Sequence, residues 1–173
     1  MSQGSFTFPM IHNSIGIMTP FLQAAIGGLF TELTGMLNIA LEGLMLIGAF
    51  FSVVFAAFTG SLMLGVLLGI LPTMLIAALF ASISLYLKAN IFISGLATNL
   101  LASGLTVVLA FQLFGNKGVI RFENLPKLPV LSIPALDRIP LLGDLFLGHN
   151  VLVYISWLCV IMAAIVIYRT PFG

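Results

Sequence analysis

The sequence predicts an all-α fold, a polytopic transmembrane helical bundle of about five spans with a proline-rich extramembrane loop between the fourth and the fifth. The first observation behind this prediction is composition. Of 173 residues, 61% are hydrophobic and only 6% are charged, whereas about 25% of the residues in a soluble domain are charged. The mean hydropathy is +1.24. A chain this apolar cannot cover itself with polar surface, so lipid must be its solvent.

The second observation is the spacing of the charges, which leaves long uncharged stretches. No formal charge occurs in residues 1–31, 43–87, 89–116 or 145–168. A membrane-spanning helix needs about 20 apolar residues, so the stretch before Lys88 holds more than one span, with a turn at FTGS (58–61). The predicted helices cover residues 15–31, 36–58, 62–87, 91–114 and 150–168.

The segment 115–149 has a different character from the rest of the chain. It contains seven charged residues and prolines at 126, 129, 134 and 140. Because each proline removes a backbone donor that lipid cannot replace, the segment is predicted to be an extramembrane loop that lies on the protein or among the lipid headgroups. A flexible linker is the alternative. The four basic and three acidic residues of segment 115–149 do not settle by themselves which side of the membrane the segment occupies.

Two polar residues stand out in the apolar run GMLNIALEGLMLIGAF (35–50). Asn38 and Glu42 are spaced one turn apart in the predicted helix. A carboxylate at the centre of a membrane helix costs about 2.5–3.5 kcal/mol, so Glu42 is expected to face a cavity, a partner or the interface. Gly35 and Gly43 flank the pair, and broken helices are tolerated where they line a cavity. Snorkelling of Glu42, or its protonation between helices, is the alternative.

Two further patterns concern contacts between helices. Gly95, Asn99 and Ser103 form a small, polar stripe on the predicted helix 91–114. This stripe indicates either hydrogen bonds between helices or the polar wall of a pathway for a hydroxyl-rich solute. Gly65 and Gly69 form a GxxxG pair, which predicts close helix packing, within this protein or at a subunit interface.

No catalytic constellation is present in the sequence. It contains no metal-ligand cluster, no nucleophile paired with a base and no phosphate-binding loop, and His12 and His149 lie at the ends of predicted spans. An enzyme is therefore not expected, and neither is a cofactor. The net charge of +1 offers no basic surface for nucleic acid.

Three segments resemble the permeases of bacterial ABC importers for simple sugars and nucleosides: GGLFTELTGMLNIALEGLMLIGAFF, LKANIFISGLATNLLASGLT and YRTPFG. The likeness is greatest to the branch that serves nucleosides with a basic-membrane-lipoprotein type of receptor. Its most specific pattern is G-x-x-N-I-x-x-E-G, at Gly35, Asn38, Ile39, Glu42 and Gly43. A K-A-N-x-x-x-S-G segment that begins at Lys88 supports it.

The resemblance implies a multi-pass subunit of the inner membrane that forms a translocation path with a second permease subunit, identical or homologous. It also implies a separate cytoplasmic ATPase and an extracytoplasmic lipoprotein that delivers the solute. The loop 115–149 would then lie outside. Family members are much longer, so residues 1–173 are interpreted as the N-terminal half of a single permease domain. The residues expected to line the path are Asn38, Glu42, Asn99 and Ser103.

The sequence also permits two other functions. One is a proton-coupled secondary transporter in which Glu42 is the coupling site. The other is an accessory structural subunit of the membrane without a pathway. The sequence does not choose between a nucleoside and a sugar, because a separate receptor makes much of that selection.

Overall fold

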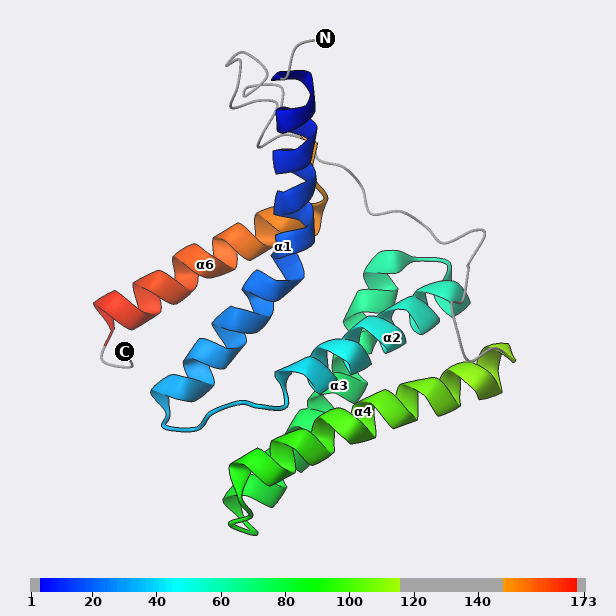
Figure 1. Cartoon of the computed structure of the whole chain (residues 1–173), viewed down its shortest axis with the longest axis vertical. Coiled ribbons are helices and arrows are strands. Elements are labelled where there is room, and N and C mark those ends of the chain that lie inside the picture. Colours follow the sequence, from blue (N-terminus) through cyan, green and yellow to red (C-terminus); the bar gives the residue numbers. More distant parts are fainter. Residues whose placement is uncertain (1–3, 116–147, 171–173) are drawn as a thin grey trace. The chain divides into compact units, whose positions relative to one another are not determined.

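The computed structural model describes residues 4–115 and 148–170, with the backbone alone for residues 4–9. The described residues form α1 (Gly4–Leu33), α2 (Leu41–Thr59), α3 (Leu62–Leu85), α4 (Ile91–Phe114) and α6 (Val151–Arg169), shown in Figure 1. Each of these helices contains a stretch long and apolar enough to cross a membrane; in α1 this stretch is Met10–Leu33. The predicted polytopic all-α fold is therefore confirmed.

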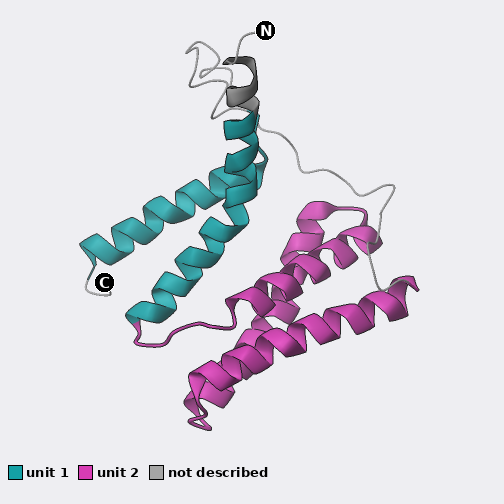
Figure 2. Ribbon diagram, in the orientation of Figure 1, with its two compact units in different colours: residues 1–33, 128–173 teal, residues 34–127 magenta. Residues whose placement is uncertain are grey.

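The helices group into two compact units, coloured separately in Figure 2. In one unit, residues 1–33 and 128–173, α1 packs against α6. In the other, residues 34–127, α2 packs against α3 and α4, and α3 packs against α4. The single permease domain over residues 1–173 stays a prediction.

A tight turn joins α2 to α3 where the FTGS segment predicts one. Gly60 ends α2 with φ of 69°, and its N–H donates to the carbonyl of Ala56 at 2.9 Å. Glycine takes this left-handed conformation without the steric cost of a Cβ, which explains why the helix stops here. The turn brings α2 and α3 side by side within their unit.

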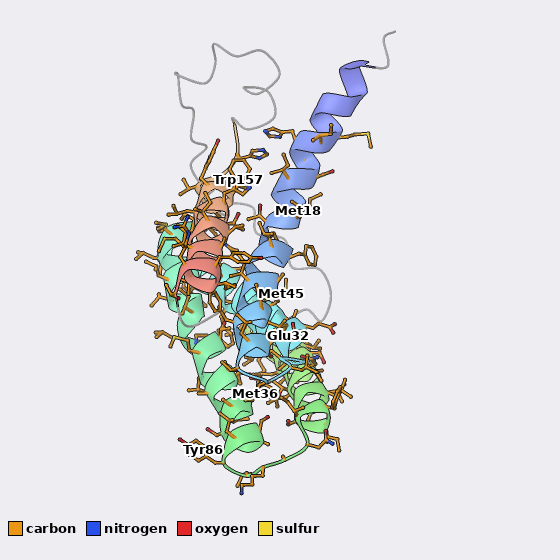
Figure 3. The ribbon with its side chains drawn as sticks, turned by 90° about the vertical axis from the view of Figure 1, so that its left-hand side faces the viewer. Met18, Glu32, Met36, Met45, Tyr86 and Trp157 are labelled. Carbon is orange, nitrogen blue, oxygen red and sulfur yellow. The ribbon has the colours of Figure 1, made fainter. Side chains whose placement is uncertain are left out.

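The turn between α3 and α4 is closed by a helix cap. The Oδ1 of Asn90 accepts hydrogen bonds from the backbone N–H groups of Phe92 at 2.9 Å and Ile93 at 3.4 Å. These bonds satisfy donors that the first turn of a helix leaves free. Tyr86 is 84% exposed, and Figure 3 shows it at the α3 end of this turn.

The predicted start of the second helix at residue 36 is wrong, since α2 begins at Leu41. Gly35 has φ of +81°, and residues 36–38 are not helical. A residue in the left-handed region interrupts a right-handed helix. Asn38 therefore lies in the connection between α1 and α2, and it is not one helical turn from Glu42.

The first helix begins earlier than predicted, at Gly4 and not near residue 15. The polar run His12–Asn13–Ser14 argues against an apolar span at this point, but it is compatible with helical backbone. The Ser14 hydroxyl donates to the carbonyl of Met10 at 2.8 Å, one turn back. A helix satisfies its own backbone and short polar side chains, so it can continue where hydrophobicity falls.

The predicted extramembrane loop 115–149 lies mostly outside the described residues. Two described glycines near its ends, Gly115 and Gly148, are in the left-handed conformation. Gly115 has φ of 69° and donates its N–H to the carbonyl of Phe111 at 2.8 Å, which ends α4. Gly148 has φ of 80° and precedes α6 by two residues.

Candidate functional site

The side chain of Asn99, in the first half of α4, is bonded to backbone on both sides of the start of α2. Its Nδ2 donates to the carbonyl of Ile39 at 3.0 Å, and its Oδ1 accepts from the N–H of Gly43 at 2.8 Å. A Cβ at position 43 would lie 2.9 Å from the Cα of Asn99, so the contact requires a glycine there. Asn99 thus joins α4 to the connection before α2 and to the first turn of α2.

Gly95, one turn earlier on α4, allows the connection between α1 and α2 to approach α4 closely. A Cβ at this position would lie 2.7 Å from the Cβ of Ile39. By contrast, Ser103, one turn later, is exposed, and its hydroxyl donates to the carbonyl of Leu100 at 3.0 Å. Of the predicted polar stripe, Gly95 and Asn99 contact the segment around residues 39–43, and Ser103 does not take part in this contact.

Asn38 carries an unsatisfied polar atom in the connection between α1 and α2. The side chain is partly buried, and its Oδ1 is inaccessible and has no hydrogen-bond partner among the described residues. A buried acceptor without a donor costs about 1–3 kcal/mol. Such a group in a folded protein indicates strain, a functional role, or a bound water or ion. Its role in a solute path stays a prediction.

Glu42 lies in the first turn of α2, and its side chain is exposed. The N-terminus of a helix favours a negative charge by about 0.3–1 kcal/mol. Because α2 begins at Leu41, the carboxylate is at the end of a span, and the penalty for a charge at the centre of a membrane does not apply to it. The helix terminus therefore explains the position of Glu42 without a solute, and its role in a path is still a prediction.

Gly65 and Gly69 lie on the face of α3 that meets α2. A Cβ at Gly65 would lie 2.5 Å from the carbonyl oxygen of Ser52 and 2.6 Å from the Cβ of Ala56. A Cβ at Gly69 would lie 2.9 Å from the backbone nitrogen of Ser52. The GxxxG pair therefore contacts a Ser-x-x-x-Ala pair of the same chain.

The unit formed by α1 and α6 contains a cavity, lined by both polar and apolar side chains, that the sequence did not predict. It has a volume of about 570 Å³. The rings of His12 and His149 stack against each other there, with centroids 3.9 Å apart and an interplanar angle of 11°. Trp157 packs its ring edgewise against His149 at 6.2 Å. The sequence signal for this cavity is a set of polar residues near two span ends, His12, Asn13, His149 and Asn150, together with Gln23 in the middle of the first span.

Neither unit shows a metal centre in its described part. Over residues 4–115 and 148–170, no group of three or more histidine, cysteine, aspartate or glutamate side chains lies close enough to hold a metal ion. What the described polar groups offer is hydrogen bonding by amides, hydroxyls and imidazoles.

Comparison with known proteins assigns the family. The model of the branched-chain amino acid transport system / permease component family matches residues 10–173. The chain belongs to this permease family. Permease components of ABC transporters are membrane subunits and not themselves enzymes. Together with the five apolar helices in the described residues, this membership indicates a multi-pass protein of the inner membrane.

Two relatives are permease subunits named for nucleosides. The permease is 34% identical over 171 residues to the nucleoside ABC transporter permease protein NupC of Lactococcus lactis, covering 95% of this chain and 53% of the relative. It is 36% identical over 165 residues to the guanosine ABC transporter permease protein NupQ of Bacillus subtilis, covering 89% of this chain and 50% of the relative. The chain thus spans about half the length of these relatives. No solved structure matches it.

Proposed function

We propose that this permease forms part of the translocation path of an ATP-driven importer for nucleosides or simple sugars. The observation that carries the proposal is the likeness to two nucleoside permease proteins over 95% and 89% of the chain. The polar groups of the described residues agree with a neutral solute, because most are uncharged hydrogen-bonding side chains. They bind and orient hydroxyl and amide groups and perform no covalent chemistry.

The proposal assigns different roles to the four predicted path residues. Asn38 carries a carbonyl oxygen that is buried in the α1–α2 connection without a described partner, and Glu42 offers an exposed carboxylate at the start of α2. Asn99 positions the segment that carries both of them, since its amide is bonded on either side of the break. Ser103 contributes an exposed hydroxyl on α4.

The proposed importer contains three partners besides this permease. A separate cytoplasmic ATPase supplies the energy, a second permease subunit supplies the other wall of the path, and an extracytoplasmic lipoprotein delivers the solute. The loop 115–149 then faces the receptor on the outside. In this orientation the α1–α2 connection, the α3–α4 turn and Arg169 share the cytoplasmic side.

The experiment that tests this assembly is stimulated ATP hydrolysis. The full-length permease is purified with its ATPase, and solute-loaded or empty receptor is added. The proposal predicts that ATP hydrolysis rises only with the loaded receptor. Purification without an ATPase, together with solute uptake driven by a proton gradient, would instead indicate a secondary transporter with Glu42 as its coupling site.

A further inference from the structure

We infer that the cavity between α1 and α6 is a binding site for the transported solute, a neutral molecule with several hydrogen-bonding groups. This inference deepens the proposed function and rests on it. The described residues that line the cavity lie in the segments 12–23 and 148–153, which belong to one unit.

The α1 wall of the cavity carries two amides, Asn13 and Gln23, on one helix face that also holds Gly16 and Pro20. Asn13, Gly16, Pro20 and Gln23 recur at spacings of three and four residues, which places them on the same side of α1. Asn13 and Gln23 lie within the apolar span Met10–Leu33. An amide in lipid lacks hydrogen-bond partners, so this face requires a polar environment, such as water or a solute.

The opposite wall is set by the residues that lead into α6. His149 is only 4% exposed, and its ring is held between the ring of His12 and the edge of Trp157. The left-handed φ of Gly148 turns the chain into this position, and a Cβ there would lie 3.6 Å from the Nε2 of His12. This wall is therefore ordered before a ligand arrives, which lowers the entropic cost of binding.

The chemistry of the lining selects the class of ligand. Its polar side chains are imidazoles, amides and a hydroxyl, and no aspartate, glutamate, lysine or arginine is among the lining residues that the structure describes. Such groups both donate and accept hydrogen bonds, as sugar hydroxyls and base edges require. The volume of about 570 Å³ lies within the range of small-molecule sites, about 300–1,000 Å³. A nucleoside and a simple sugar both present this chemistry.

Two glycines of α1 provide a matched pair of variants. Gly16 lines the cavity, and a Cβ there meets no atom within 4 Å, so a larger side chain enters free space. Gly27 has the same free space but is not among the lining residues. It lies eleven residues further along, about three turns of the same helix. Phenylalanine at either site changes helix propensity equally, and only Gly16→Phe fills the cavity.

Uptake is measured with the full-length permease, its ATPase and its receptor in vesicles, with guanosine and glucose in separate arms. We expect Gly16→Phe to lower uptake of the transported solute by about tenfold or more, equivalent to about 1.4 kcal/mol. Gly27→Phe should stay within about twofold of wild type. Equal uptake by Gly16→Phe and wild type would overturn the inference while leaving the proposed function intact.

A labelling experiment separates failure of this site from failure of the importer. Gly16→Cys and Gly27→Cys are made in a Cys159→Ala background, because Cys159 is exposed, and each is treated with a charged thiol reagent. The transported solute, guanosine or glucose, should slow labelling at position 16 and not at position 27. This readout needs no ATP, so it applies even if wild type fails to import. Labelling at position 16 that neither solute slows would overturn the inference.

Discussion

The Oδ1 of Asn99 accepts a hydrogen bond from the backbone N–H of Gly43 at 2.8 Å, across 56 residues of sequence. The other end of the same amide donates to the carbonyl of Ile39. The two bonds connect α4 to the point where the chain leaves the α1–α2 connection and becomes helical. In a unit dominated by apolar contacts, this amide gives the break between the helices a defined position.

Replacement of Asn99 by leucine should destabilise this unit. The change removes both hydrogen bonds and leaves the carbonyl of Ile39 and the N–H of Gly43 unpaired, at a cost of about 1–3 kcal/mol. The measurement is thermal unfolding of the purified permease in detergent. Ser103→Ala is the control, with an expected change below about 0.5 kcal/mol because Ser103 is exposed.

Replacement of Gly69 by valine should separate α2 from α3. The added atoms would overlap the backbone of Ser52, and overpacking of this kind costs about 1–3 kcal/mol. Gly104→Val on α4 is the matched control, because a Cβ there meets nothing within 4 Å. Unfolding temperatures of the two variants in the same detergent give the comparison. Equal losses of stability would contradict close packing at Gly69.

Loss of the cap on α4 should weaken the α3–α4 turn. Asn90→Ala removes the acceptor that serves the N–H groups of Phe92 and Ile93, at a cost of about 1 kcal/mol. Asn90→Asp should retain most of the stability, since its carboxylate accepts the same bonds. Hydrogen exchange of the amides at positions 92 and 93 reports the effect locally. Unchanged protection in Asn90→Ala would show that the cap has no role.

Asn38→Leu should lower transport without lowering the stability of the protein. The variant removes a buried, unpaired oxygen, so the free energy of unfolding should stay the same or rise. If the carbonyl of Asn38 serves the solute, uptake should nevertheless fall, and it should fall further with Glu42→Leu. Uptake by the double variant is compared with its thermal stability. Normal uptake by a stable double variant would favour an accessory subunit without a pathway.

The helices themselves were predictable because hydrophobicity and the positions of charges decide which segments enter lipid. The predicted helix 91–114 agrees with α4, which has an asparagine cap at one end and a glycine at the other. The start of α2 was not predictable to the residue. Its position depends on the left-handed φ of Gly35, and a glycine in the sequence permits this conformation without requiring it.

The contacts of the polar residues could not be derived from spacing. Asn38 and Glu42 are four residues apart, which indicates a shared helix face only if both are helical, and Asn38 is not. The partner of Asn99 lies 56 and 60 residues away along the chain. Likewise, His12 and His149 stack across 137 positions, so the cavity that they border appears only once α1 and α6 are packed together.

Solute uptake into proteoliposomes is the most direct test of import driven by ATP. They contain the full-length permease and its ATPase, with loaded receptor outside and either ATP or a non-hydrolysable analogue inside. We expect uptake of a labelled nucleoside or sugar with ATP and none with the analogue, whether or not a proton gradient is imposed. Uptake that follows the proton gradient and proceeds without ATP hydrolysis would contradict it.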